Sequence, residues 1–586
     1  KETIIGLCIC FALLIFWNPI MSAIFGPLPQ PKPQAKTEQQ MKTSPSNSTL
    51  SAKGSETVKS VEQKKTEPAP KNAAAPEEVK KPDAAGKTET VDENIKLPSL
   101  PDQTISNDFV AFKISPSSGS ITSIEFKKFL NKDKKKNIVI NEDYEPGALS
   151  FSTTDKLKPL SVDSVKESET SLRLTRGFMN DSGQRFSVIQ TWKLVDKYKT
   201  AYGIEIKNLS DRKLSIEGIH VSAGSIIPIL ELSGDYFIVE AMCINTCLEN
   251  TVAARSYSST AFDERQENLA KWIAVSNKYF TCILKPETPF RQGDGNTLRQ
   301  TIKTFKDDKG KEKPYSSMET SGVIGRTEIE PGADKALNFT YFSGPKELSL
   351  LKEFDPKAAD IMNLCYVGDS WFFGWYLWFE PIAQGFLIAL IWMKSFCGNY
   401  GISIILLTFI VKMIFWPVTD RANASMRKMQ KIQPLVQEIR TKYKDDAQKM
   451  NTKIMQLYKE HKVNPLGGCL PILLQIPIFI ALYSALNGAI ELRQSSFLWA
   501  FDLSRPDTIG MIPGIDLAIN PLVLMMTVTM VIQQYLTPSA MDPVQQKMMM
   551  ILPLVMLVLL YSLPSGLTLY WTVSQIISIV QLLVNK

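Results

Sequence analysis

A single lysine is set into an otherwise apolar stretch of the sequence. Residues 406–420 are LLTFIVKMIFWPVTD, which places Lys412 four residues after Thr408 and four before Trp416. A charged side chain inside a membrane helix costs several kcal/mol unless water, a partner or the interface relieves it. Lys412 therefore either extends to the head groups near Trp416 or acts as a working charge, and this stretch alone leaves both hypotheses open.

Other polar residues also lie in apolar segments. Each would be penalised if it faced lipid, so the group should converge on a bundle interior that holds water. The members are Thr408, Lys412, Gln475, Gln534, Ser574 and Gln575.

Common enzyme chemistry has little support in the sequence. The chain has two histidines, His220 and His461, which are far apart, and it has no GxxxxGK[ST] loop. We therefore predict no catalytic residue, no metal site, no cofactor and no enzymatic activity. Cys243 and Cys247 either form a local disulfide or remain free thiols, with Cys282 left over.

Six apolar segments are predicted to be membrane spans. The first, Thr3–Phe25, is predicted to be an uncleaved anchor (domain 1–26), with a signal peptide as the alternative. The other five are Gly401–Trp416, Leu466–Leu486, Asn520–Leu536, Met548–Leu563 and Pro564–Val584.

The polar part of the chain divides by composition and periodicity. Residues 27–106 are rich in Pro, Lys and Glu and almost without aromatics, which predicts a disordered linker. Residues 107–356 alternate apolar and polar side chains, as in RFSVIQTWKL (185–194), and predict an antiparallel β-sandwich. The segment GPKELSLLKEF (344–354) predicts a short helix that closes this domain.

The remaining segments lie on the membrane or connect its predicted spans. Residues 371–398, dense in Trp and Phe, predict an amphipathic helix lying on the membrane, with a true span as the alternative. Residues 420–465 predict two amphipathic helices in a hairpin, within a core at 399–586. That hairpin contains eleven Lys and Arg against five Asp and Glu, which places it in the cytoplasm. The same rule then places the β-sandwich on the outer side of the membrane, and an even number of spans places both termini in the cytoplasm.

Two motifs carry a family resemblance. KVNPLGGCLPILLQIPIFIALYSAL (462–486) and LPSGLTLYWTVSQ (563–575), with the charged hairpin before the first, resemble the YidC/Oxa/Alb family of membrane protein insertases. The resemblance covers residues 371–584 closely. Residues 107–354 are similar to the periplasmic domain of the Gram-negative members more by position and size than by motif.

The resemblance implies a five-helix core that encloses a hydrophilic groove with one basic residue. Lys412 stands where the family normally has Arg, which keeps the charge and loses the bidentate fork. Thr408 matches a substrate-contacting Thr, and Trp571 stands where the family has Tyr. The groove residues expected to contact substrate are Lys412, Thr408, Gln475, Gln534, Trp571 and Ser574. The lipid-exposed apolar surface expected to guide substrate segments consists of Phe479, Met526, Leu559 and Tyr570.

The implied function is insertion and folding of nascent membrane proteins in the bacterial inner membrane, alone or with the Sec translocon. Expected partners are nascent membrane proteins, the ribosome, Sec translocon components and membrane lipids. Two alternatives remain, a secondary transporter of a small solute and a purely structural assembly factor. The sequence shows no internal repeat and no intramembrane carboxylate near Lys412, and both absences weaken the transporter hypothesis.

Overall fold

The structure, a computed structural model, describes most of the chain after residue 99. The described residues are 100–131, 134–141, 147–227, 242–249, 251–256, 260–306, 312–362, 376–461, 463, 470–512, 517–537 and 543–584. The predicted anchor at 1–26 lies outside these residues, as does the predicted linker up to residue 99. The linker boundary at 106 is too late, because strand β1 (Gln103–Ser106) already pairs with β2.

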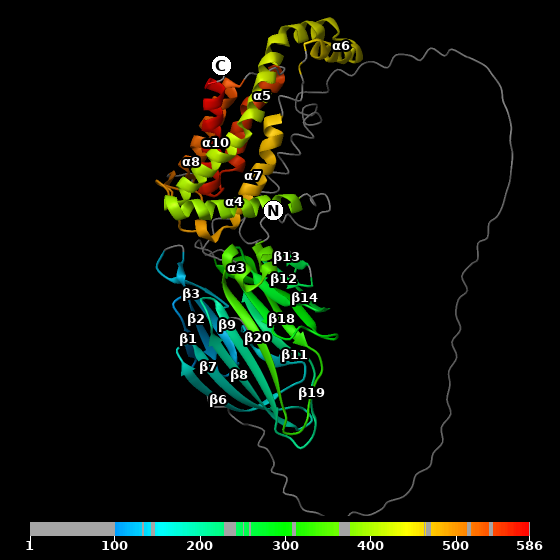
Figure 1. Cartoon of the computed structure of the whole chain (residues 1–586), viewed down its shortest axis with the longest axis vertical. Helices are drawn as coiled ribbons and strands as arrows, with labels where there is room; N and C mark the ends of the chain where they lie inside the picture. Colours follow the sequence, from blue (N-terminus) through cyan, green and yellow to red (C-terminus); the bar gives the residue numbers. More distant parts are fainter. Residues whose placement is uncertain are drawn as a thin grey trace, which may run out of the picture. The chain divides into compact units, whose positions relative to one another are not determined.

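The first half of the described chain forms antiparallel sheets (Figure 1). A four-stranded sheet contains β1, β2 (Val110–Ser115), β3 (Ser120–Leu130) and β4 (Asn137–Ile140). A five-stranded sheet has the order β14 (Phe262–Glu267), β17 (Gly295–Lys306), β18 (Glu312–Ile324), β11 (Ile219–Ile226) and β5 (Phe151–Thr153). A nine-stranded sheet has the order β13 (Val252–Ser256), β12 (Cys243–Cys247), β15 (Trp272–Ser276), β16 (Phe280–Pro286), β20 (Asp334–Pro345), β9 (Lys199–Asn208), β8 (Arg185–Leu194), β7 (Ser171–Met179) and β6 (Lys158–Ser168).

Alternation of side chains builds the core between the sheets, as the period of two predicts. In β8 the apolar residues Phe186, Val188 and Trp192 are buried, and Trp192 lies opposite Tyr202 of β9. The rings of Trp192 and Tyr202 are 5.5 Å apart. Strands β11 and β18 of the five-stranded sheet pack on β15 of the nine-stranded sheet, which confirms a β-rich domain with two facing layers.

Of the two alternatives for Cys243 and Cys247, the structure excludes the local disulfide. The two residues occupy the ends of β12, and both are free thiols. Residues four positions apart along a strand are separated by about 13 Å. A disulfide requires Cα atoms no more than about 7 Å apart, so the extended strand keeps the thiols apart.

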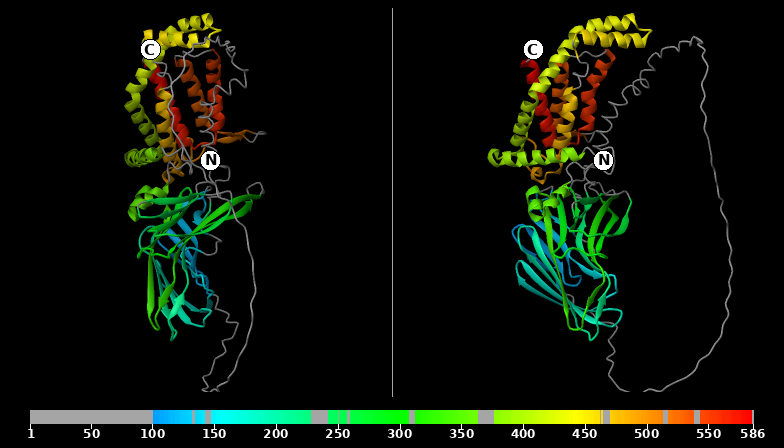
Figure 2. Two further views of the ribbon diagram at one scale, coloured as in Figure 1. Left: turned by 90° about the vertical axis from the view of Figure 1, so that its right-hand side faces the viewer. Right: turned by 45° about the vertical axis from the view of Figure 1, so that its right-hand side comes forward.

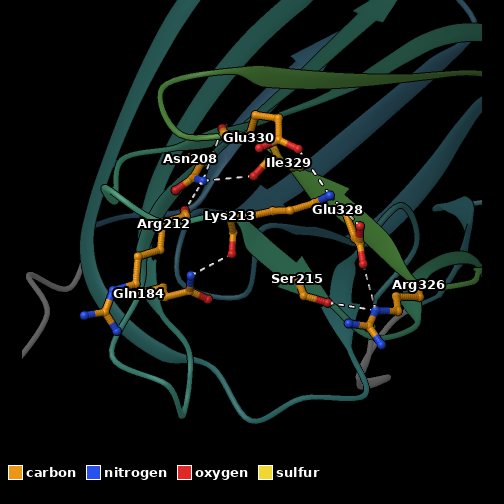
Figure 3. Close-up of polar contacts among 9 residues, drawn as sticks. All are labelled: Gln184, Asn208, Arg212, Lys213, Ser215, Arg326, Glu328, Ile329 and Glu330. Carbon is orange, nitrogen blue, oxygen red and sulfur yellow. Dashed lines mark hydrogen bonds and ion pairs between the residues drawn. The ribbon is translucent and has the colours of Figure 1, made fainter.

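Strands β10 (Leu214–Ile216) and β19 (Thr327–Ile329) form a small ribbon with charged side chains (Figure 3). Lys213 Nζ lies 2.8 Å from Glu328 and 3.2 Å from Glu330, and Arg326 Nε donates to Ser215 Oγ. Contact with the two carboxylates raises the pKa of Lys213. These groups are exposed and paired with one another, so their ion pairs contribute little to stability.

The domain ends in helix α3 (Leu348–Phe354), as predicted, with Leu348, Leu351 and Phe354 buried at helical spacing. A 3-10 helix, η2 (Pro356–Met362), follows it.

The second half of the described chain is helical. Its helices are α4 (Tyr376–Cys397), α5 (Tyr400–Lys442), α6 (Ala447–Glu460), α7 (Leu470–Gly488), α8 (Pro521–Leu536), α9 (Pro543–Leu559) and α10 (Ser565–Val584). A short 3-10 helix, η5 (Ile490–Leu492), and a hairpin of β21 (Gly510–Ile512) and β22 (Leu517–Ile519) lie between α7 and α8.

Helices α5, α7, α8 and α10 run alongside one another, and α4 lies across them (Figure 1). By length and composition, α5 and α10 are apolar and long enough to cross a membrane, and α8 and residues 549–559 are shorter apolar helices. On α4, Ala383, Leu387 and Leu390 are buried while Trp392 and Phe396 are exposed. Both faces are apolar, which suits a helix packed on protein on one side and on lipid on the other.

Helix α5 is continuous, although a helix end is expected near Pro417. It runs for 43 residues through Pro417 and Pro434 and contains the first arm of the predicted hairpin. A proline inside a helix removes one backbone hydrogen bond and bends the axis without ending the helix when neighbouring helices support it. The two helices of the predicted hairpin are joined by a turn at 443–445, and Asp446 caps α6 by accepting from the Lys449 N–H.

Candidate functional site

Lys412 of α5 joins three helices through its ammonium group. Its Nζ atom donates to Ser578 Oγ of α10 at 3.0 Å and to Gln475 Oε1 of α7 at 3.4 Å. These partners lie 166 and 63 residues away in the sequence. The lysine therefore does not simply extend along its own helix, because its end group is bound by side chains of two neighbouring helices.

Gln475 links Lys412 to Tyr570. Its Nε2 atom donates to the Tyr570 hydroxyl at 2.6 Å, while its Oε1 atom accepts from Lys412. The amide therefore uses one acceptor and one donor at once, which fixes its orientation. We call Lys412, Gln475, Tyr570 and Ser578 the polar cluster.

The polar cluster has a positive charge and no carboxylate. Within the described part of the chain, no Asp or Glu side chain forms an ion pair with Lys412. Its partners are dipoles, and Ser578 in turn donates to the Ser574 carbonyl at 3.0 Å. Dipoles stabilise an ammonium group without neutralising it, so the cluster can attract an anionic or strongly polar group of a ligand.

Two of the predicted groove residues, Thr408 and Gln534, lie outside the polar cluster's hydrogen bonds. Thr408 is buried, and its hydroxyl donates to the Ile404 carbonyl at 2.6 Å, within its own helix. Ser574 is buried and contacts the cluster, because its carbonyl accepts from Ser578 and its side chain hydrogen-bonds Tyr570. Gln534 on α8 is partly exposed and shares no hydrogen bond with Lys412 or Gln475 in the described chain.

The predicted apolar surface is divided by the structure. Phe479 and Trp571 pack edge to face with ring centroids 4.7 Å apart, and Leu559 is partly exposed. Phe479, Met526 and Tyr570 are all buried inside the bundle. Their lipid-exposed placement is therefore wrong for this conformation. Tyr570 belongs to the polar cluster instead, because its hydroxyl finds a partner in Gln475.

Sequence analysis missed Ser578, which makes the shorter contact to Lys412. A serine in a membrane helix is common and gives no strong indication by itself. The helical period does place Ser574, Ser578 and Gln581 along one stripe of α10. That stripe could have been found by extending the polar positions past Gln575.

A second polar contact joins α5 and α10 at Pro417. Gln581 Nε2 donates to Thr419 Oγ1 at 2.9 Å and to the Trp416 carbonyl at 3.3 Å. Gln581 is buried in spite of its position near the end of an apolar helix. This contact supports the backbone of α5 where Pro417 interrupts its hydrogen bonds.

The loop between α7 and α8 closes the other end of the bundle. Asp507 Oδ2 accepts from Trp499 Nε1 at 2.8 Å and from the Leu522 N–H at 2.7 Å. The first two N–H groups of α10 donate to the carbonyls of Arg505 and Leu503, at 2.6 and 2.9 Å. The first N–H groups of a helix have no partner in that helix, so the loop satisfies them and joins the ends of α8 and α10.

Comparisons with known proteins identify the family. Residues 102–384 match the model of the YidC periplasmic domain, and residues 392–586 match the model described as 60Kd inner membrane protein. A protein of Pelobacter propionicus named membrane protein insertase YidC is 31% identical over 529 residues, covering 85% of this chain and 90% of that protein. The chain belongs to the YidC family.

A second relative and a solved structure are also similar to this chain. The YidC of Geobacter sulfurreducens is 41% identical over 312 residues, covering 53% of this chain and 52% of that protein. A crystal structure of an active YidC insertase with its first transmembrane domain resolved matches with 20% identity and a TM-score of 0.35, covering 82% of this chain and 92% of that one. The YidC periplasmic model ends within α4 and the inner-membrane model begins within it, so α4 is the boundary between the β-rich and helical parts of this YidC chain.

Proposed function

We propose that this chain inserts nascent proteins into the membrane and assists their folding. The observation that carries the proposal is the polar cluster, in which Lys412 is bound by uncharged side chains among apolar helices. The names of the YidC relatives support the same activity. The proposal involves no covalent step, so the chain acts as an insertion factor and not as an enzyme.

The polar cluster lowers the barrier for moving a hydrophilic segment into the membrane. A polar or acidic tail of a nascent protein loses water when it enters apolar surroundings, and that loss is its main energetic cost. The Lys412 charge attracts the tail, and the hydroxyl and amide groups of the cluster replace part of its hydration. Of the other predicted groove residues, Trp571 follows Tyr570 in α10 and packs on Phe479 of α7, while Gln534 lies on the neighbouring helix α8.

The apolar segment of the client supplies the driving force. A span of about 20 apolar residues gains free energy on entering the hydrocarbon core, so insertion requires no nucleotide. We propose that this segment moves along the partly exposed surface near Leu559. Phe479 and Met526 are buried in this conformation, so they would contact the segment only if the helices separate.

The proposed topology has six spans in the bacterial inner membrane. The β-rich domain lies in the periplasm, and the hairpin of α5 and α6 and both termini lie in the cytoplasm. The excess of Lys and Arg between residues 420 and 465 supports this orientation. The ribosome, the Sec translocon and anionic lipids are the proposed partners of this cytoplasmic and lipid-facing surface.

Reconstituted insertion tests the proposal. A single-span client with an acidic tail is offered to proteoliposomes that contain the wild-type chain, Lys412→Ala or Lys412→Arg. We expect Lys412→Ala to reduce insertion about tenfold, equivalent to about 1.4 kcal/mol of barrier, and Lys412→Arg to retain most of it.

Two controls make the result specific. Lys394→Ala removes an exposed lysine of α4 and should leave insertion unchanged. A client with a neutral tail should lose less insertion than the acidic one in Lys412→Ala. Equal insertion by the wild type and Lys412→Ala would contradict the proposal.

A further inference from the structure

The hairpin of β21 and β22 exposes apolar side chains that no described part of the chain covers. Ile509, Met511 and Leu517 are 57%, 61% and 44% exposed. Ile512 lies opposite Leu517 in the register and is also exposed. The stretch 509–519, IGMIPGIDLAI, has one charged residue in eleven, which is unusual for a loop in water.

The hairpin has no sheet to join. Its two strands pair only with each other, with Met511 opposite Ala518 and Gly510 opposite Ile519. A single two-stranded hairpin is at best marginally stable in water. An apolar surrounding that covers its side chains would stabilise it.

The base of the hairpin is fixed to the helical bundle. The Ile509 N–H donates to the Ile519 carbonyl at 3.0 Å, and Thr508 Oγ1 donates to Asn520 Oδ1 at 2.7 Å. Asn520 Nδ2 donates to the Tyr561 carbonyl, which connects the base to the turn between α9 and α10. The hairpin cannot move away from the end of α8 without breaking these bonds.

The length of α8 places that base close to the membrane boundary. Its 16 residues span about 24 Å, less than the hydrocarbon thickness of about 30 Å. Strand β22 ends two residues before α8 begins. Apolar groups just beyond the helix end would therefore still lie at the depth of the lipid–water interface.

The direction of the hairpin agrees with this position. Figure 2 shows it, in orange, projecting sideways from the end of the bundle and across the direction of the helices. Helix α8, into which it continues, has several exposed apolar residues, including Leu524, Val528 and Val531. The apolar surface of the hairpin thus continues a surface that faces lipid.

We propose that the β21–β22 hairpin lies in the lipid–water interface and anchors the end of α8 at a fixed depth in the bilayer. Its partner is the acyl and head-group boundary of the membrane. The hairpin extends the short apolar length of α8 and reduces hydrophobic mismatch at that end. This inference rests on the membrane location of the helices and is independent of insertase activity.

The test measures lipid contact directly. A fluorescent amino acid replaces Met511 in the full chain, and the same probe replaces Val195, an apolar residue of the β-rich domain that is 60% exposed. The proteoliposomes contain lipids with brominated acyl chains, and iodide is added from water. We expect quenching by brominated lipid and protection from iodide at position 511, and the reverse at position 195.

Two outcomes would overturn the proposal. Iodide quenching at position 511 equal to that at 195 would mean that the hairpin lies in water. Protection from iodide without quenching by lipid would mean that another protein surface, such as a second copy, covers it. A further pair of proteins carries the probe at Leu517, one with Met511 and Ile512 unchanged as the parent and one with both changed to Asp. The variant with both changes should lose lipid quenching while the melting temperature of the chain stays within a few degrees of the parent.

Discussion

Lys412 is held through dipoles by side chains of two neighbouring helices, and Gln475 is the residue that connects it to Tyr570. Replacing Gln475 by Leu keeps the volume similar and leaves both the ammonium and a buried hydroxyl with fewer partners. We expect Gln475→Leu to lower the free energy of unfolding by about 1–3 kcal/mol. Thermal unfolding in nanodiscs measures the change.

The matched control is Gln534→Leu, which alters a glutamine outside the cluster on α8 and should change stability by no more than about 0.5 kcal/mol. Combining Gln475→Leu with Tyr570→Phe should cost less than the sum of the single changes, because both remove the same hydrogen bond. Equal costs for Gln475→Leu and Gln534→Leu, with additive effects in the double variant, would exclude the network.

Lys346 is a second buried lysine, at the end of β20 in the β-rich domain. It donates to the Asn277 carbonyl at 3.3 Å, and burial lowers its pKa to about 8. The unfolded chain holds this proton up to a pH near 10.5, whereas the folded chain releases it near 8. Between pH 10.5 and pH 8 the unfolded chain therefore binds this proton while the folded chain does not, so the free energy of unfolding falls as the pH falls. The total decrease is roughly 3 kcal/mol over the whole window and is complete below pH 8.

Lys346→Met should remove this dependence. The melting temperature of the wild type should rise relative to that of the variant between pH 7.5 and 9.5, measured by calorimetry on the full chain. Lys335→Met, on the same strand and exposed, serves as the control and should follow the wild type. Parallel curves for the wild type and Lys346→Met would show that Lys346 is charged and well solvated when folded.

At the scale of elements, Asp507 is the clearest case of a residue that fixes a helix from a distance. Its carboxylate caps α8 through the Leu522 N–H and also holds the Trp499 indole. We expect Asp507→Ala to cost about 1–2 kcal/mol and to speed hydrogen exchange in the first turn of α8. Exchange followed by mass spectrometry measures the effect on that turn.

Asp507→Asn keeps an acceptor oxygen and should retain more than half of the protection. Asp163→Ala, an exposed carboxylate on β6, should leave exchange in α8 unchanged. Unchanged exchange in α8 of Asp507→Ala would mean that the loop between α7 and α8 does not support the helix.

The secondary-structure elements also show which features of the fold the sequence predicts and which it does not. Alternation in 185–194 correctly indicated which side chains of β8 are buried, because a strand has a fixed period. The apolar segments corresponding to α7, α8 and α10 were also found within a few residues. The continuity of α5 was missed, because whether Pro417 ends or bends a helix depends on contacts with other helices, such as that of Gln581.

At the scale of the whole molecule, the order of the β-rich and helical parts follows from composition, whereas the site depends on contacts across the bundle. Lys412 was predicted because a charge stands out in an apolar helix. Ser578 was not, since its role arises only when α5 and α10 lie side by side. Thr408 was expected to face the groove, yet its hydroxyl is bonded within its own helix.

The most direct test of the account is to trap a client tail beside the polar cluster. A photo-crosslinking phenylalanine derivative replaces Trp571, an aromatic position next to the cluster, and ribosomes stalled on a single-span client with an acidic tail are added. The same replacement at Trp392, an exposed position of α4, is the control. The account predicts crosslinks from the tail at position 571 that fall in Lys412→Ala and return in Lys412→Arg, with few at position 392. The absence of crosslinks at position 571, or crosslinks that stay the same when Lys412 is replaced by Ala, would contradict the proposed role of the polar cluster.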